Sequence, residues 1–156
     1  MRALSRECVT SRGRAGFSYP RDVCFQCTRC ALCCGDTKSR RRHVLLLWGE
    51  AQAISKAVLK PVETFAVEIE GQEPYVYEMR KTGEEGKCFF LEGRNCSVYE
   101  LRPLVCVFYP FELRGMKDGK HGFFCTQECP GIGEGKKLEK DYFEGLFRRA
   151  CRQLGA

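Results

Sequence analysis

The sequence predicts a small single domain of the α+β class, with short strands and a few helices organised around a polycysteine metal centre. Three observations support this prediction. The chain has 156 residues, enough for one domain with a core. Short apolar stretches of strand length alternate with a few stretches of helical period. Twelve residues are cysteine, and five of them lie within residues 24–34, CFQCTRCALCC.

The N-terminal part differs in composition from the rest. Residues 1–20 are rich in Arg, Ser and Gly and show no apolar period, so we expect a basic, disordered arm there and a cysteine-cluster domain over 21–156. Residues 1–43 contain ten Lys/Arg and three Asp/Glu, a charge of +7, against +6 for the whole chain. The cluster 38–42 in this part reads as a solvated basic loop. Contact with nucleic acid is the alternative explanation of the charge.

The sequence pattern after residue 43 predicts a series of short strands and helices. The apolar run 44–47 is a buried strand, and 49–60 is a helix ended by Pro61. Alternating patterns predict a hairpin of 65–70 with 75–80, and a second hairpin of 88–91 with 97–99. Pro103 and Pro110 bracket a helical turn, and 111–114 and 122–125 are strands. From Lys136 onward, apolar residues recur on one face of a docking helix, namely Leu138, Tyr142, Phe143, Leu146, Phe147, Ala150 and Leu154.

The N-terminal sequence indicates a reducing compartment, and in such a compartment the cysteines indicate a bound metal. The N-terminus has no apolar core of a secretory signal, and the longest pure apolar run, 44–48, is far shorter than a membrane span. We therefore expect a cytoplasmic protein without a membrane span, in which thiols stay reduced. Twelve thiols in such a chain favour metal binding over disulfides.

The spacing of the thiols suggests which metals they would hold. Cys-x-x-Cys turns overlap at 24/27, 27/30 and 30/33, and further cysteines follow at 88, 96, 106, 125 and 129. With two histidines in the chain, the ligands must be almost all sulfur, which suits zinc, iron–sulfur clusters or monovalent copper. The triple Cys27, Cys30 and Cys33 has the spacing that holds a cubane cluster in bacterial ferredoxins. A fourth cysteine would be due at position 37, where the chain has Thr37, so this ligand would have to come from elsewhere; Cys106 or Cys129 could supply it.

Cys33 and Cys34 are adjacent in the sequence, so we expect their side chains to point in different directions. Two such thiols would serve two metals, or two edges of one cluster, better than a single tetrahedral ion. This expectation favours a polynuclear centre or two sites over one structural zinc.

Four spaced motifs resemble the CxxCxxCC (YkgJ-like) cysteine-cluster family, whose members are described as zinc- or iron-chelating. The opening motif matches Phe25 and the cysteines through Cys34, and the middle motif matches 88–91. The most distinctive motif runs from Cys96 through Arg102-Pro103 and Cys106 to Pro110, and the closing one covers 125–133. Ala31 departs from the family, because a glycine is common at that position.

The resemblance implies nine metal ligands, which are Cys27, Cys30, Cys33, Cys34, Cys88, Cys96, Cys106, Cys125 and Cys129. Cys24 lies outside the family pattern, while Cys8 and Cys151 are expected to be spectators. The predicted function is an iron–sulfur protein of the four-iron type with an electron-transfer or redox role. The alternatives are a structural zinc module that contacts nucleic acid, and a protein that stores or delivers a soft metal. No catalytic constellation is recognised, and neither a redox partner nor a substrate is indicated.

Overall fold

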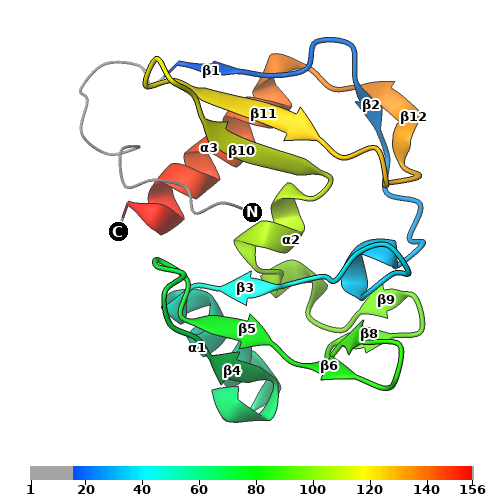
Figure 1. The fold of residues 1–156 in the computed structure, drawn as a ribbon, viewed down its shortest axis with the longest axis vertical. Helices are drawn as coiled ribbons and strands as arrows, with labels where there is room; N and C mark the ends of the chain where they lie inside the picture. The colour runs from blue at the N-terminus through cyan, green and yellow to red at the C-terminus, as the bar shows by residue number, and fades with distance from the viewer. Residues whose placement is uncertain (1–15, 156) are drawn as a thin grey trace. The chain divides into compact units, whose positions relative to one another are not determined.

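The computed structural model describes residues 16–155, which divide into two compact units. One unit joins 16–28 to 108–155, and the other is the continuous segment 29–107. Figure 1 shows short strands and helices in both, so the predicted α+β class is confirmed. Most of the predicted arm, with Cys8, lies outside the described residues.

In the discontinuous unit, a three-stranded sheet has the order β1-β11-β10. Strand β10 (Phe111–Gly115) is antiparallel to β11 (His121–Cys125), with Phe111 opposite Cys125. Strand β1 (Phe17–Ser18) is parallel to β11. A separate pair joins β2 (Cys24–Phe25) to β12 (Ile132–Lys137). The predicted strands 111–114 and 122–125 are confirmed.

Helix α3 (Lys140–Leu154) covers the sheet with the predicted apolar face, which buries Phe143, Leu146, Phe147 and Ala150. It begins later than expected because 132–137 extend as β12. Phe17 stacks on Phe147 at a ring-centroid distance of 5.1 Å, and Tyr19 stacks on Phe143 at 5.1 Å. The expectation of a disordered arm therefore does not hold for its last residues, since these two half-buried aromatic rings pack against α3.

The continuous unit, residues 29–107, contains a sheet of order β3-β5-β4. The strands are β3 (Leu45–Leu46), β5 (Tyr77–Met79) and β4 (Ala66–Glu68), all antiparallel. Helix α1 (Trp48–Val58) follows β3, and the short 3₁₀ turn η3 (Val62–Thr64) precedes β4. Leu46, Ile54 and Phe65 are fully buried in this unit. The predicted strand, helix and first hairpin are confirmed.

The remaining elements of this unit are short and carry cysteines. Strand β6 (Lys81–Thr82) pairs with β7 (Lys87–Cys88), and β8 (Leu91–Glu92) pairs with β9 (Asn95–Cys96). The 3₁₀ turn η4 (Tyr99–Leu101) and helix α2 (Leu104–Phe108) follow. The second predicted hairpin is shifted, because Gly93, at φ 63°, allows a tight two-residue turn between β8 and β9. The predicted helical turn between the prolines is confirmed as α2.

A buried carboxylate joins the starts of α1 and α2. Glu50 Oε2 accepts a hydrogen bond from Leu47 N at 2.9 Å, and Oε1 accepts one from Leu104 N at 2.7 Å. Two backbone N–H groups that lack helical partners are thus satisfied by one side chain. Because Cys106 lies two residues after Leu104, this carboxylate also fixes the segment that carries a predicted ligand.

None of the helices within 16–155 combines the length and the apolar character that crossing a bilayer requires.

Candidate metal centre

A tight turn places two sulfur atoms side by side at the start of the continuous unit. Residues Leu32–Cys34 form the 3₁₀ turn η2, closed by a hydrogen bond from Cys34 N to Ala31 O at 3.0 Å. Within it, the Sγ atoms of Cys33 and Cys34 are 3.9 Å apart and share a hydrogen bond. The expectation that these adjacent side chains point in different directions is therefore wrong. A 3₁₀ turn crowds successive side chains more than a strand does.

The loop around Cys30 adopts an unusual backbone. Arg29 and Ala31, on either side of it, have φ of 54° and 62°, in the left-handed region that favours glycine. The turn therefore explains why a glycine would suit position 31. The Arg29 side chain holds the loop from outside by donating from Nη1 to Asn95 Oδ1 at 3.0 Å.

Replacing Ala31 by glycine tests this backbone. We expect Ala31→Gly to raise the free energy of unfolding by about 1 kcal/mol, because the Cβ clash of the left-handed conformation disappears. Urea unfolding of the wild type and the variant, both metal-free, measures the change. A variant less stable than the wild type would show that residue 31 is not left-handed in solution.

The cysteine turn is fastened to the hairpin that carries Cys88. Gly35 forms an isolated antiparallel bridge with Lys87, and Asp36 N donates to Gly86 O at 3.1 Å. A Cβ at Gly35 would lie 3.1 Å from Gly86 O, so a glycine permits this close approach. Cys88 therefore lies one residue from a direct backbone pairing with the turn.

The next hairpin and helix α2 supply two more thiols. Cys96 lies opposite Leu91 in the β8–β9 pair, and Ser97 N donates to Phe90 O at 2.9 Å. Cys106 is in the first turn of α2, where its N donates to Pro103 O at 2.9 Å. The thiols of the unit are thus carried by four separate segments, each held by its own backbone hydrogen bonds.

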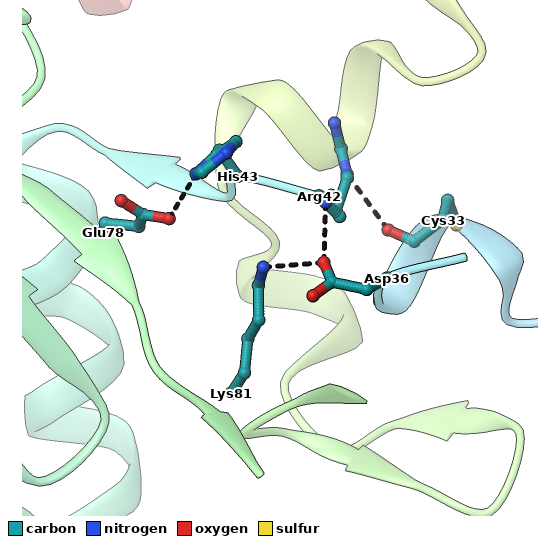
Figure 2. Close-up of polar contacts among 6 residues, drawn as sticks. All are labelled: Cys33, Asp36, Arg42, His43, Glu78 and Lys81. Atoms are coloured by element: carbon teal, nitrogen blue, oxygen red, sulfur yellow. Dashed lines mark hydrogen bonds and ion pairs between the residues drawn. The ribbon is translucent and has the colours of Figure 1, made fainter. Parts of the chain in front are cut away.

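Arg42 joins two of these segments. Its Nε donates to Cys33 O at 3.1 Å, and its Nη2 donates to Val105 O at 3.4 Å. Figure 2 shows the guanidinium reaching from the chain before β3 toward the Cys33 turn. The expectation of a solvated basic loop over 38–42 is wrong for Arg42, which is half-buried among thiols.

Asp36 balances the charge beside Arg42. Its Oδ1 accepts from Arg42 N at 2.8 Å and pairs with Lys81 Nζ at 2.6 Å, as Figure 2 shows. These contacts hold the pKa of Asp36 below its usual range, with the Lys81 hydrogen bond as the largest cause. The carboxylate therefore ties the end of the cysteine turn to β6.

The thiols influence one another's ionisation. Burial raises the pKa of Cys106 to about 12, and the neighbouring Cys88, Cys33 and Cys96 add to the rise. Burial also raises the pKa of Cys88, to which Cys96 and Cys33 contribute. Conversely, the hydrogen bond from Cys34, together with the charge of Arg42, lowers the pKa of Cys33 to about 6. Each of these thiols therefore lies within range of the charge that the others carry when ionised.

The pKa of Cys33 predicts an unusually reactive thiol in the metal-free, reduced protein. Its thiolate fraction grows as the pH rises through 6, so iodoacetamide should modify Cys33 at neutral pH well before Cys106. Timed labelling followed by peptide mass spectrometry gives the rate at each cysteine. If Cys33 reacts only as the pH approaches about 8.5, the value for an ordinary thiol, the turn does not activate it.

These residues suit a sulfur-ligated metal. Two sulfurs on one tetrahedral ion lie about 3.8 Å apart, given metal–sulfur bonds of about 2.3 Å, and the Cys33–Cys34 separation of 3.9 Å is close to this. Within residues 16–155, no three Cys, His, Asp or Glu side chains are already close enough to surround an ion. Binding would therefore require the other thiols to close in on this pair and to release their protons.

The remaining predicted ligands lie in the discontinuous unit. They are Cys27, Cys125 and Cys129, and Cys24 belongs to the same unit. The boundary between the units falls at residues 28 and 29, so the Cys-x-x-Cys-x-x-Cys run is divided between them. The structure thus brings together Cys33, Cys34, Cys88, Cys96 and Cys106 as electrostatic neighbours, with Cys30 in the adjoining loop.

Comparison with known proteins agrees with this reading. The profile of the CxxCxxCC family, described as a "putative zinc- or iron-chelating domain", matches residues 26–136. The chain belongs to the CxxCxxCC family. Membership supports metal binding, and the family description names zinc and iron without choosing between them.

Two relatives of this CxxCxxCC protein come from Methanocaldococcus jannaschii, and both are named uncharacterized proteins. MJ0661 is 26% identical over 134 residues, which are 81% of this chain and 68% of the relative. MJ0939 is 26% identical over 129 residues, which are 80% of this chain but only 42% of the relative. No solved structure matches the chain.

The sequence pattern of this CxxCxxCC protein did not single out two residues of the candidate site, Arg42 and Glu50. Arg42 is part of a basic run, and only its distance in sequence from the cysteine turn distinguishes it from Arg40 and Arg41. Glu50 lies on a helix with an apolar stripe, which does not distinguish it as functional. Its place in the first turn of α1, where a carboxylate can accept hydrogen bonds from unpaired N–H groups, is the signal in the sequence that points to it.

Proposed function

We propose that the unit 29–107 holds an iron–sulfur cluster of the four-iron type, and that the protein transfers electrons or serves as the redox part of an enzyme. The proposal is carried by a set of thiols, those of Cys33, Cys88 and Cys106, whose segments are held together by the Gly35–Lys87 bridge and by the hydrogen bonds of Arg42 to Cys33 O and Val105 O. No histidine or carboxylate of the described unit belongs to this set, so its donors are sulfur alone. Iron–sulfur clusters are held by such thiolates.

Cys33, Cys88, Cys96 and Cys106 are the four proposed ligands. The charges of the other three, when ionised, each raise the pKa of Cys106. Cys34 lies beside Cys33, and Cys30 is in the same loop; we assign them as additional thiols at the edge of the centre. A cluster would supply reversible one-electron chemistry when bound. The chain's own part is to hold the thiolates and to limit water, and no catalytic residue is assigned.

Arg42 would stabilise the ionised thiols. Its positive charge lowers the pKa of Cys33, Cys88 and Cys106, in each case against the raising effect of burial. Four thiolates in a partly buried site carry a large negative charge, and a fixed cation reduces the cost of holding it.

The test is the metal and sulfide content of protein isolated without oxygen. We expect about four iron atoms and as many acid-labile sulfides per chain, and a brown colour that dithionite bleaches. A colourless protein with stoichiometric zinc and no sulfide would refute the cluster.

A structural zinc site is the second candidate, because the 3.9 Å separation of the Cys33 and Cys34 sulfurs also suits one tetrahedral ion. Zinc would then contribute folding free energy without redox chemistry. The proposed cytoplasmic location fits either metal, since both need reduced thiols. Contact with nucleic acid stays a prediction, because most of the basic arm lies outside the described residues; binding that weakens steeply with salt would test it.

A further inference from the structure

We propose that Arg29, Tyr99 and Arg102 form a docking surface for a protein partner that presents carboxylates. All three residues belong to the continuous unit, 29–107, and both guanidinium groups lie against the exposed ring of Tyr99. The inference concerns what this surface binds, and it uses none of the thiols of the unit.

The Tyr99 ring is exposed because it lies in a short surface turn. Tyr99 is the first residue of η4, and its exposed fraction is 43%. Leu101 in the same turn and Leu32 in the cysteine turn are also exposed. Aromatic residues and arginine are enriched where proteins bind one another, and exposed tyrosine and arginine often supply most of the binding energy. The groups that flank the ring therefore indicate what it could bind.

Arg102 is fixed over the ring by two contacts with the same residue. Its guanidinium carbon lies 3.7 Å from the centroid of the Tyr99 ring, and its Nε donates to Tyr99 O at 2.9 Å. An arginine that stacks on an aromatic ring uses the face of its guanidinium and keeps the terminal N–H groups for other acceptors. The ring thus positions a cation whose remaining donors can bind a partner.

Arg29 approaches the same ring from the cysteine loop. Its guanidinium carbon is 5.9 Å from the centroid of the Tyr99 ring, within the range of cation–π attraction. Its Nη1 donates to Asn95 Oδ1 at 3.0 Å, which holds the side chain against the β8–β9 pair. Figure 1 shows the turn that follows residue 29 beside this pair of strands. Two segments far apart in the sequence therefore place positive charge at one exposed ring.

Neither guanidinium has an acidic partner within residues 16–155. The ion pairs of this part of the chain include neither Arg29 nor Arg102, although Glu100 lies between Tyr99 and Arg102 in the sequence. A guanidinium has five N–H donors, and each of these two makes one hydrogen bond to another described residue. The donors that remain suit carboxylates, which can accept two parallel hydrogen bonds from one arginine.

Two features favour a protein over a nucleic acid as the partner. The Arg102 guanidinium, at 3.7 Å, already occupies a face of the Tyr99 ring on which a base would otherwise stack. Glu100 is exposed and adjacent to Tyr99 in the sequence, so a phosphate backbone would meet a negative charge beside the two arginines. A protein can place a cation opposite Glu100 and carboxylates opposite the arginines.

The position of the surface along the chain indicates what a partner would reach. Arg29 directly precedes Cys30, and Asn95 directly precedes Cys96, which is a proposed ligand. A protein bound here would contact the chain next to the candidate metal centre, where an electron donor or acceptor has to approach. That the partner exchanges electrons rests on the proposed function, whereas the binding of an acidic protein does not.

The experiment measures the binding of a fluorescent acidic peptide, EELEELEE, to the full chain by anisotropy at low salt. We expect Arg29→Gln/Arg102→Gln to weaken binding by about tenfold, because charge-assisted contacts to the peptide carboxylates are lost. The matched control, Lys56→Gln/Lys60→Gln, removes the same charge from two exposed lysines of this unit and should change the affinity by less than about twofold. Equal losses in the two double variants would overturn the proposal, because only the net charge would then matter.

Substitutions of the ring separate position from charge. Tyr99→Leu keeps both arginines but removes the ring that holds them, so we expect peptide binding to weaken by about fivefold. Tyr99→Phe keeps the ring and should bind as the wild type does. If Tyr99→Leu binds the peptide as tightly as the wild type, the ring does not position the guanidiniums and the proposed surface is wrong.

Two further readouts identify the class of partner and separate this proposal from the metal centre. An oligothymidine of equal charge should bind more weakly than the peptide, and tighter binding would identify a nucleic-acid surface instead. A wild type that does not bind the peptide would also overturn the proposal. Metal content is measured in the same samples. A colourless zinc protein that binds the peptide would refute the cluster and keep the docking surface, while an iron–sulfur protein that does not bind it would refute the docking surface alone.

Discussion

Arg42→Gln is expected to weaken metal binding by about 100-fold, the equivalent of roughly 3 kcal/mol. The substitution removes the hydrogen bonds to Cys33 O and Val105 O, which join the cysteine turn to the segment of Cys106. It also removes the positive charge that lowers the pKa of Cys33, Cys88 and Cys106. Competition with a chelator of known affinity measures the loss.

Two further variants separate charge from geometry. Arg42→Lys keeps the charge without the planar fork, so we expect a smaller loss than for glutamine. Arg41→Gln removes the charge of the exposed neighbour and should leave the affinity nearly unchanged. Equal losses in Arg42→Gln and Arg41→Gln would mean that only the net charge of the basic run matters.

Glu50→Gln is expected to lower the free energy of unfolding by about 3 kcal/mol. The two carboxylate oxygens each accept from a backbone N–H, of Leu47 and of Leu104, and the side chain is buried. A glutamine has one acceptor oxygen and an NH₂ group that donates, so one of these N–H groups would face another donor. Urea unfolding of the metal-free protein measures the change.

The matched control is Glu68→Gln, an exposed carboxylate of the same unit, which should change the stability by less than about 0.5 kcal/mol. Because Leu104 precedes Cys106, Glu50→Gln should also weaken metal binding, while Glu68→Gln should not. Identical unfolding midpoints for the two variants would contradict the bridging role of Glu50.

The elements with a clear hydrophobic period could be predicted from the sequence. Helix α1, the β4–β5 hairpin, the β10–β11 pair and the apolar face of α3 each bury a regular stripe, so local pattern and packing agree. Strand β1 could not be predicted, because Phe17 and Tyr19 are single aromatic residues in a polar stretch. Their packing depends on Phe143 and Phe147, more than 120 residues away in the chain.

The candidate site could be predicted by residue type but not by arrangement. Spacing predicts that the cysteines are ligands, since dense thiols have no other packing reason. It could not show that a 3₁₀ turn brings the Cys33 and Cys34 sulfurs to 3.9 Å, nor that the run divides between two units. The roles of Arg42 and Asp36 could not be predicted either. Arg42 donates to backbone carbonyls of Cys33 and Val105, and Asp36 pairs with Lys81, and only the folded chain brings these partners close.

The central claim is that sulfur atoms from separate segments of 29–107 hold one bound metal centre. The most direct measurement compares alkylation at every cysteine in the metal-loaded and metal-free protein, read by peptide mass spectrometry. Metal loading should protect Cys33, Cys88, Cys96 and Cys106 together, and its removal should expose all four. If these four cysteines are labelled at unchanged rates in the two states, the metal is bound elsewhere and the proposed centre is wrong.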